Sequence, residues 1–161
     1  MKINVLVGLA LFSMMSTWTV AADLAPTIIA RCGESSGYAF YAERKIVPRE
    51  KAGWQKDGIT GGKVVLARLP NGSLDLIYDD QSESVRSSIK EGAVITLALS
   101  NDEELTVIIR YSHTSEIYSF WSDRRGRLQY ALLQSKAPPA LTKQALFVGE
   151  CSEINFRRVL G

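Results

Sequence analysis

The sequence predicts an all-β domain, an antiparallel meander of about eight or nine short strands forming a small barrel or a two-sheet sandwich. The clearest evidence is in residues 95–100 and 105–111, where apolar and polar side chains alternate and β-branched residues are frequent. A period of two is typical of a strand with one face in the core. The polar segment 101–104 joins these two runs as a hairpin turn. The only sustained helical pattern lies within the first 22 residues.

Turn-forming residues separate the other apolar runs at short spacing, as in a meander. The remaining expected strands are residues 37–42, 64–69, 74–78, 84–89, 117–121, 128–133 and 146–151. Asn71 and Gly72 lie between two of these runs and predict a type I′ turn, because both residue types tolerate a positive φ. Residues 51–62 are rich in glycine and are expected to form a long loop, and residues 140–145 a single helical turn.

Residues 1–22 have the features of a secretory signal peptide. Lys2 is followed by the apolar segment 5–15, and small residues ending at Ala22 precede Asp23. This order is typical of an exported precursor, with cleavage expected between Ala22 and Asp23. A membrane span would need about 20 apolar residues, and serines and threonines interrupt this segment earlier. We therefore expect a periplasmic or secreted protein whose mature chain does not insert into the membrane.

Residues 23–161 are expected to form a single domain, because no low-complexity linker or internal repeat divides them. The chain has two cysteines, Cys32 and Cys151, near the two ends of this domain. In an oxidising compartment they are expected to form a disulfide. A reactive thiol or two buried free cysteines are the alternatives, but a redox motif would require Cys-x-x-Cys spacing. A disulfide between the first and last strands favours a barrel over a sandwich.

The composition excludes several classes of function. The chain has 19 Lys and Arg against 17 Asp and Glu, a formal charge of +2. This balance argues against binding to nucleic acid, whose phosphates attract strongly basic surfaces. One histidine and two cysteines are too few for a multi-histidine or four-cysteine metal site. The sequence therefore predicts no metal and no cofactor.

His113 is the first residue to consider for catalysis, because its side chain titrates near neutral pH. Ser112 and Glu116 are close in sequence, so a small secreted hydrolase that uses His113 with one of them is an alternative function. However, residues 112–115 have the polar composition of an ordinary hairpin turn. We therefore assign no catalytic residue from the sequence.

Aromatic and basic side chains form the best candidate binding surface. Its residues are Trp54, Tyr118, Phe120, Trp121, Arg124 and Arg125. Because neighbouring residues of a strand point to opposite faces, Tyr118 and Phe120 oppose Trp121, so that one face lies in the core and the other is available for contacts. The two arginines indicate an acidic partner or an anionic envelope polymer. Core packing is the competing interpretation for the aromatic side chains.

Several short segments carry a resemblance to known proteins. The segments Cys32-Gly33-Glu34-Ser35-Ser36-Gly37-Tyr38, Gly53-Trp54, Leu132-Leu133-Gln134-Ser135-Lys136 and Gly149-Glu150-Cys151 resemble those of uncharacterised small secreted bacterial proteins. That resemblance implies no activity. In size, export and terminal cysteines the chain is also similar to the periplasmic inhibitors of C-type lysozyme, which are small β-barrels. It lacks their Ser-Gly-x-Arg/Lys-Tyr loop, so this resemblance implies architecture alone.

These observations predict an exported, non-catalytic β-domain that binds a partner protein or a small envelope-derived ligand. The alternatives are the secreted hydrolase and a structural envelope protein.

Overall fold

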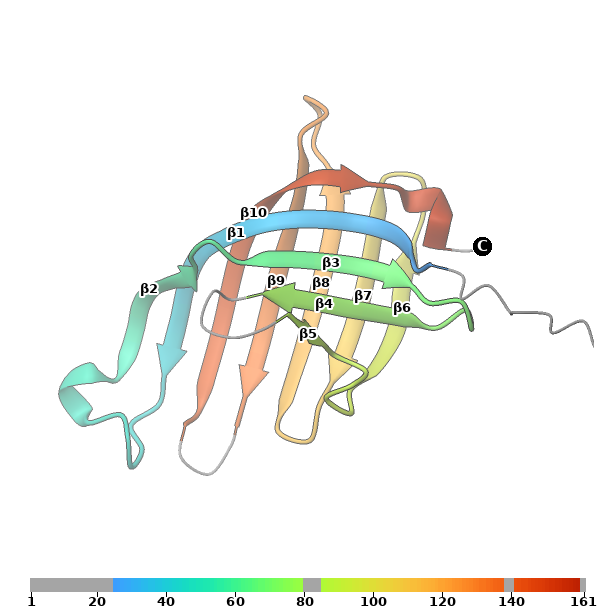
Figure 1. Cartoon of the computed structure of the whole chain (residues 1–161). Coiled ribbons are helices and arrows are strands. Elements are labelled where there is room, and N and C mark those ends of the chain that lie inside the picture. The colour runs from blue at the N-terminus through green and yellow to red at the C-terminus, as the bar shows by residue number, and fades with distance from the viewer. Residues whose placement is uncertain (1–24, 80–84, 138–140, 160–161) are drawn as a thin grey trace, which may run out of the picture.

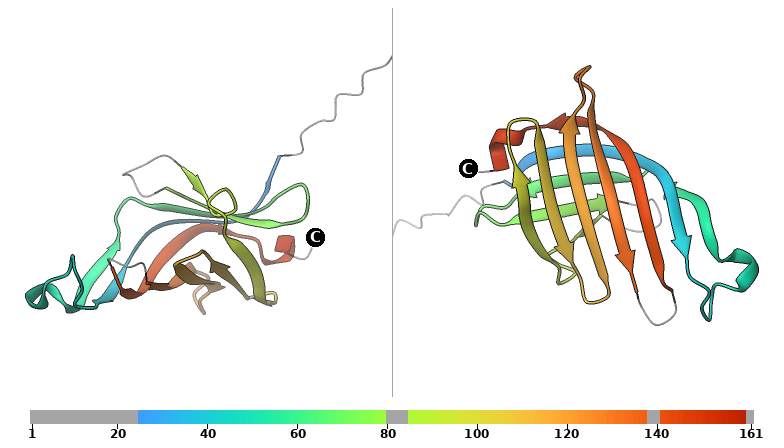
Figure 2. Two further views of the ribbon diagram at one scale, coloured as in Figure 1. Left: turned by 90° about the horizontal axis from the view of Figure 1, so that it is seen from below. Right: turned by 180° about the vertical axis from the view of Figure 1, so that it is seen from behind.

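The computed structural model describes residues 25–79, 85–137 and 141–159. The expected signal peptide, including the cleavage site between Ala22 and Asp23, lies outside these residues, as does Ser84. The described residues form one antiparallel sheet, so the all-β prediction is confirmed. A curled half-barrel results, with one end of the sheet folded over the other (Figures 1 and 2).

The strands are β1 (Thr27–Tyr41), β2 (Gly53–Ile59), β3 (Lys63–Arg68), β4 (Leu74–Asp79), β5 (Arg86–Ser87), β6 (Val94–Ser100), β7 (Glu104–Arg110), β8 (Thr114–Ser122), β9 (Leu128–Lys136) and β10 (Lys143–Ile154). Two short 3-10 helices, η1 (Arg49–Lys51) and η2 (Phe156–Val159), complete the described elements. The strand order is β5-β4-β3-β1-β10-β9-β8-β7-β6, and β2 also pairs with β1.

Strand β1 organises the sheet. Residues Thr27 to Cys32 pair with β3, and Ser35 to Tyr41 pair with β2. Strand β10 follows the other edge of β1, with a break in register between Cys32 and Ser35. Because of this division, β3 and β4 cross the inner face of the sheet over one part of β9, β8, β7 and β6 (Figure 1). In the described residues, the terminal strands β5 and β6 are not paired with each other, so the sheet remains open.

The core lies on the inner, concave face. Phe120 and Tyr130 are fully buried, and their rings stack with 6.2 Å between centroids. The Tyr130 hydroxyl donates a hydrogen bond of 3.0 Å to the Gly33 carbonyl oxygen, which joins β9 to the register break in β1. Leu66 on β3 and Leu76 on β4 cover the opposite side of this core.

Several expected elements differ from the structure. Residues 51–62 are not a loop, because β2 occupies most of the segment and pairs along β1. Their glycine content misled the prediction: at Gly58, a Cβ atom would lie 2.4 Å from the Ser35 carbonyl oxygen, so glycine permits close strand contact. The expected helical turn at 140–145 is wrong from Lys143 onward, where pairing with β9 begins.

The hairpin around Asn71 is confirmed, but its turn type is not the expected one. The Gly72 amide donates to the Leu69 carbonyl oxygen, which places Pro70 and Asn71 at the two central positions. The ring of Pro70 holds φ negative, so a type I′ turn is excluded. The turn thus begins one residue earlier than expected, and Gly72, with a φ of +83°, follows its two central residues. The first strand also starts earlier than expected, at Thr27, and the expected strand 84–89 contains only the short strand β5.

The disulfide between Cys32 and Cys151 is confirmed and spans 119 residues in sequence. It joins β1 to β10 directly across the sheet, at the break in their register. Cross-linking distant parts of a chain limits the conformations of the unfolded state and so stabilises the fold.

Replacing both cysteines with serine should lower the free energy of unfolding by about 4 kcal/mol, because a loop of this length carries a large closure entropy. Urea denaturation under non-reducing conditions would measure the change. Wild-type protein treated with reductant is the matched control and should lose a similar amount. A loss below about 1 kcal/mol in both samples would contradict this role for the disulfide.

Candidate functional site

A pocket of about 390 Å³ lies beneath β3 and β4, on the inner face of the sheet. Its other walls come from β8, β9, the β7–β8 turn and the segment between β5 and β6. The polar residues lining it are Lys63, Tyr78, Asp79, Arg86, Glu91, Tyr111, Ser112, His113, Thr114, Glu116, Tyr118, Gln134 and Lys136. Apolar contacts come from Ile59, Val64 and Leu132. The pocket therefore combines many polar groups with apolar surface of about equal extent.

Glu116 on β8 is the most buried acidic residue of the pocket, with 8% of its surface exposed. Its Oε1 accepts a hydrogen bond of 2.8 Å from Gln134 Nε2 on the adjacent strand β9. Burial raises the pKa of Glu116, because the charged form loses its hydration, although hydrogen bonds from Gln134 and Tyr118 act in the opposite direction. Glu116 thus holds a proton at higher pH than an exposed glutamate.

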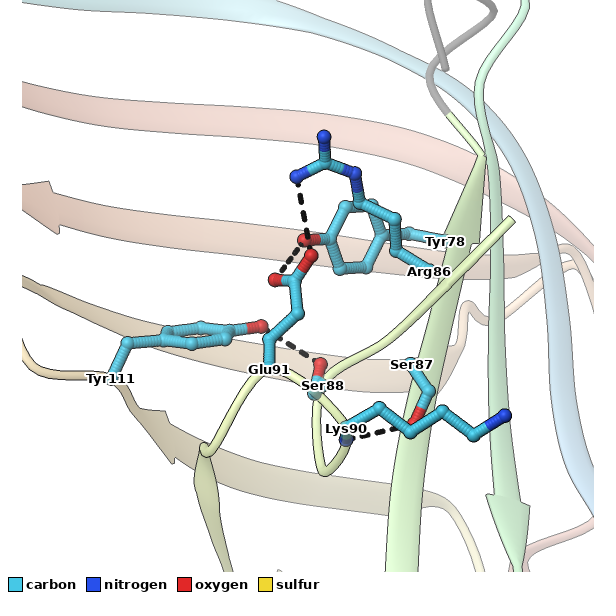
Figure 3. Close-up of polar contacts among 7 residues, drawn as sticks. All are labelled: Tyr78, Arg86, Ser87, Ser88, Lys90, Glu91 and Tyr111. Atoms are coloured by element: carbon cyan, nitrogen blue, oxygen red, sulfur yellow. Dashed lines mark hydrogen bonds and ion pairs between the residues drawn. The ribbon is translucent and has the colours of Figure 1, made fainter. Parts of the chain in front are cut away.

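A second polar group lies on the opposite wall of the pocket, where β4 meets the segment after β5. Tyr78 donates a hydrogen bond of 2.6 Å to Glu91 Oε2, and Arg86 Nη1 lies 3.2 Å from Glu91 Oε1 (Figure 3). Burial and the hydrogen bond to Glu91 raise the pKa of Tyr78 well above its usual range. The Tyr78 hydroxyl therefore remains protonated and holds the Glu91 carboxylate in place.

Tyr111 connects this wall to the end of β7. Its hydroxyl lies 2.8 Å from Ser88 Oγ, and Ser88 is fully buried (Figure 3). Burial raises the pKa of Tyr111 to about 12. This contact attaches the segment between β5 and β6 to the sheet, so the wall that carries Glu91 has a defined position.

Lys63 and Lys136 supply ammonium groups at the pocket. Within the ranges the structure describes, neither forms an ion pair. The charge of Lys136 also lowers the pKa of Glu116, against the larger effect of burial. These two lysines can therefore interact with a ligand without breaking an existing ion pair.

His113 and Ser112 lie in the β7–β8 turn, where the Tyr111 amide donates to the Thr114 carbonyl oxygen. Both side chains are exposed, and both line the pocket. Among the described residues, no hydrogen bond joins His113 to Ser112 or to Glu116. A nucleophile and its base need such a contact, so the geometry does not favour the hydrolase that the sequence left open.

The other residues predicted to form a binding surface do not gather in one place. Tyr118 and Phe120 are buried in the core and cannot form an exposed surface, although Tyr118 also lines the pocket. Trp54 is 69% exposed and lies on β2, not in a loop. Arg124 and Arg125 are exposed in the β8–β9 turn, far from β2 in Figure 1, and Trp121 just before them is partly exposed.

Sequence reasoning missed the pocket residues Glu91, Gln134 and Lys136, and weighed Glu116 only as a neighbour of His113. A signal for Glu116 was present, because it shares the inward face of β8 with Tyr118 and Phe120. A carboxylate at an inward position of an apolar strand indicates either a buried pair or a site. The pairing of Glu116 with Gln134 depends on strand register and was not visible in the sequence.

No protein-family model, curated protein or solved structure matches the chain. Over the described ranges, no helix has the length and apolar character needed to cross a membrane. Nor do three or more His, Cys, Asp or Glu side chains of those ranges gather as metal ligands would. The function is therefore argued from the geometry of the pocket itself.

The raised pKa of Glu116 predicts a dependence of stability on pH. The folded chain binds this proton more tightly than the unfolded chain, so the stabilisation is complete below the ordinary glutamate pKa of 4.5 and is lost as pH rises through the raised value. Glu116→Gln does not titrate, so wild type should lose stability relative to this variant as the pH rises above the ordinary glutamate pKa of 4.5.

Urea denaturation at a series of pH values would measure this difference. Glu150→Gln, which changes an exposed carboxylate on β10, is the matched control and should show no such trend. A constant difference between wild type and Glu116→Gln over this range would contradict the assignment.

Proposed function

We propose that this chain is an exported, non-catalytic β-domain that binds a small polar ligand of the cell envelope in the pocket beneath β3 and β4. The observation that carries this proposal is a pocket of about 390 Å³ whose walls hold polar groups in hydrogen-bonded positions. Small-molecule sites in proteins typically occupy about 300–1,000 Å³ and place a few polar groups on a defined frame.

The chemistry of the lining supports a ligand with both hydrogen-bond donors and acceptors. The Glu116 carboxyl group accepts hydrogen bonds, whereas the ammonium groups of Lys63 and Lys136 donate them. The apolar side chains of Ile59, Val64 and Leu132 supply the contact area for the carbon skeleton. Amino sugars, amino acids and short peptides have this combination of groups.

An envelope location is supported by the disulfide and by the N-terminal segment. Disulfides persist in oxidising compartments such as the bacterial periplasm, and Cys32 and Cys151 are bonded. The order of charged, apolar and small residues in 1–22 is typical of exported precursors. Ligands available to a periplasmic or secreted protein include fragments of envelope polymers.

A thermal-shift screen tests the proposal, with amino sugars, amino acids and short peptides as probes at millimolar concentration. A ligand present at about 100 times its dissociation constant should stabilise the fold by about 2.7 kcal/mol, or several degrees in Tm. Gln134→Ala and Lys136→Ala should each reduce the affinity about tenfold, because each removes a polar contact. Glu150→Gln, outside the pocket, should bind as wild type does.

A stabilising probe whose effect is equal in wild type and in both pocket variants would place its site elsewhere. Absence of stabilisation by every probe class would contradict a ligand of this chemistry.

A further inference from the structure

The outer face of the sheet differs sharply from the inner one. Its middle row consists of Tyr38, Leu146, Leu133 and Ile117, which are direct cross-strand neighbours on β1, β10, β9 and β8. The first three are 54%, 49% and 46% exposed. Large apolar side chains thus lie side by side on a surface that faces solvent, at positions where an antiparallel sheet normally carries polar residues.

The two rows that flank this one carry no charge either. On one side are Phe40, Gln144, Ser135 and Ser115, again paired across the same four strands. On the other side are Ser36, Val148, Ala131 and Ser119. We call these three rows the outer patch. Charged residues make up 22% of the chain, so a block of this size without one is a marked local departure.

The outer patch continues onto β2 through an aromatic contact. The rings of Phe40 and Trp54 meet edge to face, with 5.6 Å between centroids, and Trp54 is 69% exposed. Lys56 follows Trp54 on the same face of β2, so positive charge begins only at this margin. Exposed aromatic residues around an apolar centre are typical of protein–protein interfaces.

We propose that the outer patch is the contact surface for a second copy of this chain, related by a two-fold axis. A surface without charge offers nothing to attract an acidic protein or an anionic polymer, whereas the same patch on a second copy is uncharged and apolar in the same places. A two-fold interface brings identical surfaces together, so such a patch is complementary to itself. The serines and Ala131 of the flanking rows are small enough to let two sheets approach to about 10 Å.

The outer patch would form the centre of a dimer interface that extends over the surrounding outer face. The neighbouring strands β2, β1, β10, β9 and β8 lie about 4.8 Å apart. At about 3.3 Å per residue, strands of the length of β8 and β9 are about 30 Å long. The whole outer face of these five strands therefore measures about 700 Å², and the uncharged outer patch at its centre, four strands wide and five residues long, measures about 300 Å². A stable interface buries about 800 Å² on each partner. Packed sheets cross at about 30°, so the contact is closest near its centre, at Leu146 and Leu133 of both copies.

Sedimentation equilibrium of wild type and two lysine variants tests this proposal. Wild type should form dimers at micromolar concentration, and Leu146→Lys and Leu133→Lys should each raise the dissociation constant at least about 100-fold, because two like charges then face each other across the axis. The control is Leu99→Lys, at a similarly exposed position on β6 outside the patch, which should dimerise as wild type does. All proteins are prepared with the same N-terminus, because residues 1–22 contain an apolar segment that would itself affect association.

A cross-linking experiment does not depend on how well the lysine variants fold. A short thiol-reactive cross-linker such as a bismaleimide should join two copies of Leu146→Cys, whereas it should not join two copies of Leu99→Cys; the natural cysteines are already paired with each other. Gln134→Ala, in the pocket, should remain dimeric, so a failure of the ligand proposal would not affect this result.

Three outcomes would overturn the proposal. Wild type that remains monomeric at about 100 µM is the first. The second is a dimer that persists in both lysine variants and is not cross-linked through Leu146→Cys, because its interface would lie elsewhere. The third is monomeric wild type that binds vesicles of phosphatidylcholine and phosphatidylglycerol through the patch, which would assign it to a lipid surface.

Discussion

The fold depends on how strand β1 divides its hydrogen bonds. A strand has two edges, and β10 occupies one of them. The other edge is shared end to end by β3 and β2, with the change of partner near the register break between Cys32 and Ser35. The Cys32–Cys151 disulfide lies at this break, where the regular ladder between β1 and β10 is interrupted. The covalent bond thus reinforces the place where backbone pairing is irregular.

The pocket follows from this division. Because β3 leaves β1 after its first half, β3 and β4 cover only part of the inner face. The inward side chains of β8 change accordingly along the strand, from Phe120 in the core through Tyr118 to Glu116 at the pocket. Strand β8 therefore contributes both to the stability of the domain and to its candidate site. Its polar side chains begin where the covering strands β3 and β4 end.

The two faces of the sheet have separate chemistries and support separate proposals. Paired polar groups lie in the pocket on the inner face, and an uncharged apolar surface covers the outer face of β1, β10, β9 and β8. In a dimer joined through the outer patches, both pockets face away from the interface. Ligand binding and dimerisation would then use different surfaces of the same four strands and would not compete.

Much of the strand content was predictable because it depends on local patterns. The alternation in residues 95–100 and 105–111 requires one buried face in any all-β arrangement, and the hairpin turns follow from short polar segments. Strand β2 was not predictable in this way. Its glycines resemble those of a loop, and only the close approach of Gly58 to Ser35 explains them. The type I′ turn was wrong because the turn begins one residue earlier than expected, at Leu69, so that Pro70 occupies a central position at which a positive φ is excluded.

By itself, the sequence determined the all-β class, the placement of Tyr118 and Phe120 together on one face of a strand, and the pair of cysteines available for one disulfide. These properties follow from side-chain periodicity and from residue count, which do not depend on distant contacts. The tertiary structure alone decided that Glu116 meets Gln134, that Tyr78 meets Glu91, and that Tyr38, Leu146, Leu133 and Ile117 form one row. Each of those contacts requires a particular strand order and register, and a shift of one residue would move every side chain of a strand to the other face.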